Sequence, residues 1–328
     1  MGSPMRRRDF ITLLGGASAA WPVAVRAQQP AMPIVGFLHA GSPEVTPGLV
    51  AGFRKGLNET GFVEGNNVSI EFRWANNDER LLPELAADLV RRRVSVIAAP
   101  NGQDAALAAK AATSSIPIVF NSTDDPIKVG LVASYNRPEG NLTGINSMLR
   151  ELGPKRLGLL HELFPRATRL AVLTSPNSAP LVAELRDSAS TIGVQIEAIA
   201  AGTIGAIDTA FETVSKMGVD ALLTAPSALF GARRLQLAIQ AARHLTPVMY
   251  HDRLFAESGG LMSYGTSLAD IYRQVGVYVG RLLKGAKPSE LPILQPTKFE
   301  FVINLQAART IGLAIPPTLL ALADQVIE

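Results

Sequence analysis

Short apolar runs alternate with amphipathic stretches along nearly the whole chain. In the first half, apolar or alternating runs of strand length occur at residues 33–38, 68–74, 94–99, 116–120 and 142–146. Between them, apolar side chains recur every three or four residues, which predicts helices that end near residues 60, 92 and 113. Strands and helices that alternate at this spacing form parallel sheets. The regular alternation in 68–74 leaves one face polar and places that strand near a sheet edge.

A second series of the same kind follows residue 154. It predicts strands at 169–173, 194–200, 221–223 and 247–250. The helices between them are expected at 155–164, 179–192 and 204–216, with one more that ends near residue 244. Beyond it we predict a short strand within 259–265, a long helix at 268–284, a strand at 299–303, a helix at 305–311 and a short tail.

The two series share an internal repeat. Residues 107–112 and 116–120 match 237–242 and 246–250 at a constant offset of 130 residues. The order of strand, polar loop and helix recurs as well, so we predict two lobes of like topology. In open α/β sheets, ligands bind beyond the carboxyl ends of the strands. The strand-end loops of the two lobes would then face each other across a cleft.

Polar residues gather at these strand ends. Residues 116–126 show this most clearly, because an apolar strand runs directly into hydroxyl, amide and carboxylate groups. Each such residue could also be an ordinary turn or helix cap. The residues expected to bind ligand are His39, Ser42, Asn101, Gly102, Asn121, Ser122, Asp124, Asp125, Ser175, Asn177, Pro226, Ser227, Tyr250, Asp252 and Tyr264. His251 also follows a strand.

The N-terminus carries an export signal. Arg6, Arg7 and Arg8 form a basic twin-arginine pattern, residues 11–25 are moderately apolar, and small residues precede a cleavage site after Ala27. The apolar run is shorter than the roughly 20 residues of a membrane span. We predict a removable leader at 1–27, with an added start at 1–4 before the natural initiator Met5.

Composition and motifs exclude several classes of function. The chain has 31 basic and 28 acidic residues, but the leader holds four arginines and one aspartate, which leaves 27 of each sign. A neutral mature chain has no excess of basic residues with which to bind nucleic acid. The absence of cysteine excludes disulfides and thiolate sites. No dinucleotide, P-loop, serine-hydrolase or zinc-protease signature occurs, and the histidines lack metal-ligand spacing, so we expect neither cofactor nor metal.

Several segments together resemble one family. They are 52–57 (Gly-Phe-Arg-Lys-Gly-Leu), 61–68 (Gly-Phe-Val-Glu-Gly-Asn-Asn-Val), 85–90 (Leu-Ala-Ala-Asp-Leu-Val), 137–144 (Arg-Pro-Glu-Gly-Asn-Leu-Thr-Gly), 155–163 (Lys-Arg-Leu-Gly-Leu-Leu-His-Glu-Leu), 259–265 (Gly-Gly-Leu-Met-Ser-Tyr-Gly), 316–320 (Pro-Pro-Thr-Leu-Leu) and 323–328 (Ala-Asp-Gln-Val-Ile-Glu). The chain resembles ABC-transporter substrate-binding proteins, whose members include tryptophan and other aromatic amino-acid binders. The resemblance covers the whole mature chain and indicates the family rather than the ligand.

The resemblance implies a type I periplasmic binding fold, an α/β architecture of two mostly parallel sheets flanked by helices. Lobe 1 would comprise 28–143 and about 266–296, and lobe 2 would comprise 144–265 and about 297–328. Three crossing segments are expected near 142–146, 261–265 and 296–299. The protein would be a periplasmic monomer without a lipid anchor, exported by the twin-arginine route.

The implied function is capture of a small molecule in the cleft and its delivery to a membrane permease, without catalysis. For an amino acid, groups around Ser42, Asn101 and Ser122 would hold the carboxylate. One of Asp124, Asp125 or Asp252 would hold the ammonium group, and Tyr250, Phe230 or Tyr264 would contact the side chain. Two alternatives remain open. One is a ligand-sensing module for a membrane receptor, and the other is a racemase or hydrolase with Asp124 and Asp252 as its acid–base pair.

Overall fold

The computed structural model describes residues 32–176 and 178–328. The predicted leader and the candidate Asn177 lie outside the described residues.

The first lobe is built on a five-stranded sheet in the order β2-β1-β3-β4-β5, with every neighbouring pair parallel. Its strands are β1 (Ile34–His39), β2 (Ser69–Trp74), β3 (Val96–Ala99), β4 (Ile118–Ser122) and β5 (Leu142–Asn146). Its connecting helices are α2 (Pro47–Glu59), α3 (Leu82–Arg91) and α4 (Gln103–Ala112), with the 3₁₀ turns η1 (Pro43–Val45) and η2 (Glu79–Leu81). The alternating strand β2 lies at the edge, as its pattern predicts.

The second lobe has a seven-stranded sheet in the order β12-β11-β10-β9-β8-β6-β7. Only the β10–β11 pair is antiparallel among the described strands. The strands are β6 (Arg169–Thr174), β7 (Gln195–Ala200), β8 (Ala221–Thr224), β9 (Val248–Tyr250), β10 (Met262–Gly265), β11 (Glu300–Asn304) and β12 (Gln325–Ile327). The helices are α5 (Gly153–Leu163), α6 (Ala179–Ser190), α7 (Ile204–Met217), α8 (Ala228–Ala232), α9 (Arg234–Arg243), α10 (Arg253–Glu257), α12 (Leu305–Thr310) and α13 (Pro317–Leu322).

The two sheets share one topology. The order β2-β1-β3-β4-β5 in the first corresponds strand by strand to β7-β6-β8-β9-β10 in the second. The repeated segments found in the sequence occupy matching places, since α4 leads into β4 and α9 leads into β9. The prediction of two lobes with like topology is therefore confirmed, and β11 and β12 extend only the second sheet.

Short elements are where the sequence interpretation was wrong. The single helix expected to end near residue 244 is divided at Arg233 into α8 and α9. Helix α10 was not expected, and the tail after Pro316 forms α13 and β12. Strand β4 continues through Asn121 and Ser122, which were expected in a loop. Elements of three to six residues are too short to show a clear hydrophobic period.

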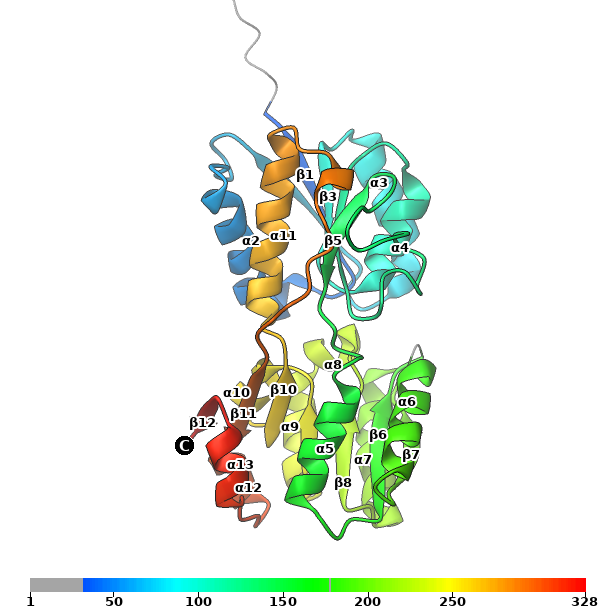
Figure 1. Cartoon of the computed structure of the whole chain (residues 1–328), viewed down its shortest axis with the longest axis vertical. Helices are drawn as coiled ribbons and strands as arrows, with labels where there is room; N and C mark the ends of the chain where they lie inside the picture. Colours follow the sequence, from blue (N-terminus) through cyan, green and yellow to red (C-terminus); the bar gives the residue numbers. More distant parts are fainter. Residues whose placement is uncertain (1–31, 177) are drawn as a thin grey trace, which may run out of the picture. The chain divides into compact units, whose positions relative to one another are not determined.

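Helix α11 (Leu268–Leu283) joins the first lobe although it follows ten strands in sequence. It packs beside α2 against the first sheet (Figure 1), where Phe53 and Val275 belong to the same hydrophobic cluster. The contact is backbone to backbone. A Cβ atom at Gly56 would overlap the carbonyl oxygen of Arg273, and one at Gly276 would overlap that of Phe53. Glycine at these positions allows the two helices to lie this close.

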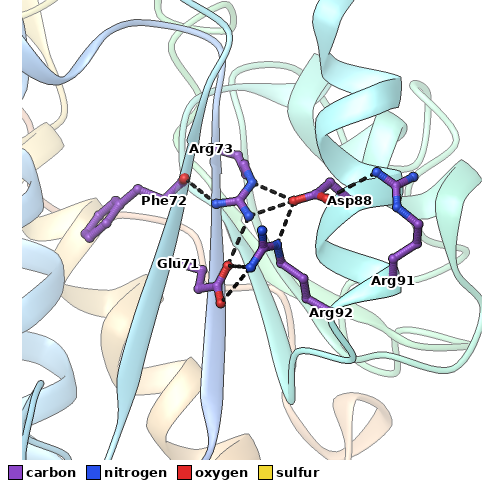
Figure 2. A network of polar contacts seen from close by, with 6 residues as sticks. All are labelled: Glu71, Phe72, Arg73, Asp88, Arg91 and Arg92. Atoms are coloured by element: carbon purple, nitrogen blue, oxygen red, sulfur yellow. Dashed lines mark hydrogen bonds and ion pairs between the residues drawn. The ribbon is translucent and has the colours of Figure 1, made fainter.

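A network of charged side chains ties the edge strand β2 to α3 (Figure 2). Asp88 accepts hydrogen bonds from Arg73 at 2.6 Å, Arg92 at 2.9 Å and Arg91 at 3.1 Å. Glu71 lies 3.0 Å from Arg73 and 3.2 Å from Arg92. Hydrogen bonds from Arg73 and Arg92 lower the pKa of Asp88 to about 2. The edge strand is thus held by ionised groups over the acidic to neutral range.

The chain passes between the two sheets directly after β5, directly after β10 and in the segment between α11 and β11. The expected crossings at 142–146 and 261–265 are themselves mostly strands of the sheets. Thr266 donates a hydrogen bond to the Ser147 carbonyl at 3.2 Å, which joins the first two passages. The fully buried Arg156 reinforces them by donating to the carbonyls of Leu149 at 2.5 Å and Tyr264 at 3.4 Å.

Candidate ligand-binding cavity

A cavity lies at the carboxyl ends of strands from both sheets. It is lined by residues that follow β1, β3, β4 and β5 in the first lobe and β6, β8 and β9 in the second, together with parts of the helices α6, α8, α9, α10 and α11. The sequence candidates that line it are His39, Asn101, Gly102, Asn121, Asp124, Ser175, Pro226, Ser227 and Asp252. The general expectation of a site at the strand ends thus coincides with this cavity.

The remaining described candidates do not line the cavity. Ser122 is fully buried and donates to the Asp124 carbonyl at 2.7 Å, so its hydroxyl holds the turn after β4. Asp125 accepts from the Ile127 backbone N–H at 2.9 Å and from the Tyr135 hydroxyl at 3.3 Å. These two residues have the turn-forming role that the sequence left as their alternative.

Ser42, Tyr250 and Tyr264 also lie away from the lining. Ser42 precedes η1, and its carbonyl accepts from Thr46 at 3.1 Å. Tyr250 is fully buried in the core of the second lobe and stacks on Phe255 with ring centroids 4.8 Å apart. Tyr264 packs against Phe299 and Phe301. Phe230, named as a possible side-chain contact, is likewise a core residue.

His39 and Tyr272 form a buried pair at the first-lobe wall. The Gly41 backbone N–H donates to His39 Nδ1 at 2.9 Å, so the proton of the neutral ring must reside on Nε2. His39 Nε2 therefore donates to the Tyr272 hydroxyl, 2.8 Å away. Burial lowers the pKa of His39 to about 3, which keeps the ring uncharged at neutral pH. Tyr272 comes from α11, and no local pattern could have linked it to a residue 233 positions earlier.

Asp124 is already engaged by neighbouring side chains. Its Oδ1 lies 2.9 Å from Arg150 Nη1, and its Oδ2 accepts from Gln103 at 3.2 Å. Gln103 in turn accepts from Thr123 at 2.7 Å, and Arg150 reaches Glu184 on α6 at 3.5 Å. Arg150, from the segment after β5, thereby connects the two lobes beside the cavity. Because both carboxylate oxygens of Asp124 already contact these side chains, it is a poor candidate for binding a ligand ammonium group.

Asp252 has a different environment. It is 1% exposed and follows β9 as the N-cap of α10, where Oδ1 accepts from the Leu254 N–H at 2.8 Å. Its Oδ2 has no hydrogen-bond partner among the described residues. Burial raises the pKa of Asp252 to about 7, which the Leu254 hydrogen bond and the charge of Arg234 oppose. A buried carboxylate oxygen without a donor is costly unless a ligand supplies one.

Two asparagines of the first lobe show the same feature. The Oδ1 atoms of Asn101 and Asn121 are buried and have no donor within the described part of the chain. Both residues line the cavity. Asn101 follows strand β3, and Asn121 lies near the end of β4. The two strands pair with Ala99 opposite Phe120. Residues that line the cavity thus carry buried acceptors without a donor among the described residues on both lobes.

The second-lobe wall is rich in hydroxyl donors. Ser178 accepts from the Ser175 backbone N–H at 3.0 Å, and the two hydroxyls lie 3.1 Å apart at the start of α6. Ser227 is the N-cap of α8, and its side chain makes no capping hydrogen bond. Arg234 of α9 also lines the cavity and adds a positive charge. His251 is also buried. Its burial lowers its pKa to about 3, and the nearby positive charge of Arg156 contributes to the same effect.

The sequence candidates omitted several lining residues. They are Thr46, Glu79, Gln103, Asp104, Thr123, Arg150, Ser178, Arg234, Tyr272 and a set of apolar side chains that includes Leu149, Leu181 and Phe255. Gln103 and Asp104 directly follow the predicted Gly102, so extending each strand-end loop by one helical turn would have found them. Tyr272 and Arg234 come from within helices and carried no such signal.

Within residues 32–176 and 178–328, no group of three or more His, Cys, Asp or Glu side chains is arranged to hold a metal ion. None of the helices described there has both the length and the apolar character needed to cross a membrane.

Comparison with known proteins places these features in a family. A curated relative, a tyrosine-binding protein of Clostridioides difficile, is 26% identical over 259 residues, which is 77% of this chain and 73% of the relative. Two solved structures cover 90% of this chain and 99% of their own at 24% identity: a conserved domain protein from Vibrio cholerae, with a TM-score of 0.82, and an ABC domain in complex with L-Trp from Streptococcus pneumoniae, with a TM-score of 0.80. The likeness to the structures shows the fold. The family model for ABC transporter substrate binding proteins matches residues 45–327, and the chain belongs to that family.

Proposed function

We propose that this protein captures an amino acid, with an aromatic one as the first candidate, and delivers it to the permease of an ABC importer. Family membership supports the role in transport. The curated relative named as a tyrosine-binding protein and the fold relative solved with L-Trp support the ligand class. The observation that carries the proposal is the fully buried Asp252 of the cavity lining, whose Oδ2 has no donor among the residues that the structure describes.

In this proposal Asp252 binds the ligand's ammonium group. An ammonium group brings three N–H donors and a positive charge, which matches a carboxylate that has one oxygen capped and the other unpaired. Asp124 and Asp125 are less suitable, because Arg150 and Gln103 engage the first and the turn after β4 engages the second. Asp252 is thus selected from the three aspartates that the sequence left open.

The hydroxyl groups of the second lobe would hold the ligand's carboxylate. The Ser227 side chain lies at the cavity and makes no capping hydrogen bond, and Ser175 and Ser178 stand at the start of α6, whose N-terminal N–H groups favour anions. The positive charge of Arg234 lies on the same wall. This arrangement replaces the earlier expectation of Ser42 and Ser122, whose positions are away from the lining.

The proposal includes export and lobe closure. The twin-arginine leader at 1–27 would direct the folded protein to the periplasm, where it would work as a monomer. Binding would close the two lobes over the ligand by a hinge motion, because the chain crosses between the sheets in only a few segments. The closed form would then dock on the permease.

Isothermal titration of residues 28–328 with L-tyrosine, L-tryptophan and L-phenylalanine tests the ligand class. We expect saturable binding of at least one of them. Asp252→Asn keeps the α10 cap, because asparagine caps a helix about as well as aspartate. It should nevertheless weaken binding by about 100-fold, since the ammonium group loses its charged partner in a buried site.

The matched control is Asp187→Asn, which removes one exposed carboxylate from α6 and should bind as the wild type does. Mass spectrometry of any small molecule that co-purifies with the protein gives an independent identification. Binding of another ligand class, with no heat from any amino acid, would refute the assignment.

A further inference from the structure

Two buried amide oxygens of the first lobe, on Asn101 and Asn121, have no donor among the described residues. Asn121 Nδ2 donates to the Pro100 carbonyl at 3.1 Å, and because a carbonyl can only accept, the nitrogen must face it. Asn121 Oδ1 is therefore the atom that has no partner within the described part of the chain. The residue is 2% exposed, so bulk water does not replace the missing donor.

Asn101 lies at the same cavity wall as Tyr272. Burial raises the pKa of the Tyr272 hydroxyl, and a hydrogen bond with the Asn101 side chain opposes that effect by lowering the pKa. The Oδ1 atom of Asn101 is buried and has no donor among the described residues.

We infer that the ligand carries an N–H or O–H donor at the end away from its ammonium group, and that the amide oxygens of Asn101 and Asn121 receive it. The inference rests on the proposed function, in which Asp252 of the other lobe binds the ammonium group. The inference distinguishes amino acids by whether their side chain carries such a donor. Tyrosine, tryptophan and glutamine carry such a donor, whereas phenylalanine and leucine do not.

The negative charge of the first-lobe wall also favours a ligand whose side chain carries a donor. Glu79 and Asp104 also line the cavity, and neither forms an ion pair with any residue in the described ranges. Burial raises the pKa of Asp104, and the nearby charge of Asp124 adds to the effect. A side chain that offers only acceptors, such as that of glutamate, would meet like charge and unmatched oxygens. The wall should therefore reject it.

Paired ligands with and without the side-chain donor test the inference. The pairs are L-tyrosine with L-phenylalanine, L-tryptophan with 1-methyl-L-tryptophan, and L-glutamine with L-glutamate, each titrated into residues 28–328. A site built to hydrogen-bond a ligand group rejects the analogue without it strongly, so within a binding pair we expect a preference of about 100-fold or more for the donor. A preference below about tenfold, or one for the analogue, would overturn the inference.

Variants assign the preference to the two asparagines. Asn101→Ala and Asn121→Ala should each reduce the ratio within the binding pair by about tenfold or more, mainly by weakening the donor-bearing ligand. Asn58→Ala, on the exposed face of α2, is the control and should keep the wild-type ratio. If Asn121→Ala fails to fold, as judged by circular dichroism, Asn101→Ala alone decides, and an unchanged ratio refutes the assignment.

The titrations distinguish failure of the donor inference from failure of the proposed amino-acid function. If tyrosine and phenylalanine bind equally, the donor inference is wrong and the amino-acid function stands. If no member of any pair binds, the proposed function fails and the donor inference fails with it.

Discussion

At the scale of single residues, the ionised carboxylate of Asp252 would favour ligand binding but lower the stability of the free protein. An unfolded aspartate has a pKa of about 3.9, and burial raises the pKa of Asp252 to about 7. Between these values the folded protein holds a proton that the unfolded chain has lost. The free energy of unfolding therefore falls as pH rises through this window, by up to about 4 kcal/mol. The carboxylate that would attract an ammonium group is, without ligand, a destabilising charge.

This gives a test that needs no ligand. Urea unfolding of the wild type should show stability decreasing between about pH 4 and pH 7, whereas Asp252→Asn should lack that component. At pH 8 the variant should be the more stable protein by up to about 4 kcal/mol, the loss that it avoids. Parallel pH profiles for the two proteins would show that Asp252 is ionised without cost and would remove this reason for a ligand partner.

At the scale of elements, the pair α2 and α11 holds the first lobe together through glycine. The segment at 52–57, one of those that carry the family resemblance, places Gly52 and Gly56 against the backbone of α11. Gly276 and Gly280 of α11 lie against α2 and the adjacent Thr60. A methyl group at Gly56 or Gly276 would meet a carbonyl oxygen, which cannot move aside without shifting the helix. The sequence motif is thus explained by packing rather than by ligand contact.

Gly56→Ala and Gly276→Ala should each lower the free energy of unfolding by about 3 kcal/mol, measured by urea denaturation. Gly158→Ala is the matched control, because an added Cβ at this α5 position meets nothing within 4 Å. There alanine should stabilise the protein by about 0.5–1 kcal/mol through helix propensity. A neutral effect at both Gly56 and Gly276 would mean that the helices separate easily.

At the scale of the whole molecule, Arg150 couples the lobes beside the cavity. It pairs with Asp124 of the first lobe and with Glu184 of α6, and its backbone N–H donates to the Thr123 carbonyl at 3.1 Å. Glu184 is 45% exposed at its side chain, so that ion pair is screened by solvent and contributes little. The more buried contact with Asp124 should bear most of the effect of removing the guanidinium group.

Arg150→Gln should weaken ligand binding by about fivefold to tenfold, because a smaller fraction of the free protein is then in the binding-competent arrangement. Small-angle X-ray scattering should show a larger radius of gyration for the free variant than for the free wild type, and ligand should reduce the difference. Arg243→Gln, at the exposed end of α9, is the control. Unchanged scattering and affinity in Arg150→Gln would exclude a coupling role.

The sequence by itself determined the architecture and predicted a candidate site at the strand ends. Strand and helix periods predicted two parallel sheets, the repeat at an offset of 130 residues predicted their like topology, and polar strand ends predicted where a ligand would bind. The periods and the polar strand ends are local features, since each depends on residues a few positions apart, and the repeat compares two such local patterns. For the same reason the long elements were predicted well and the short ones, such as α10 and β12, were not.

Only the tertiary structure decided which polar side chains line the cavity and which of them lack partners. Asp124, Asp125 and Asp252 are alike in sequence context, but an arginine from the next connection pairs with the first and a turn engages the second. The third is buried with one oxygen unmatched. Burial and pairing depend on residues that are distant in sequence, as Tyr272 is from His39. A local pattern fixes the period of an element but not what packs against it.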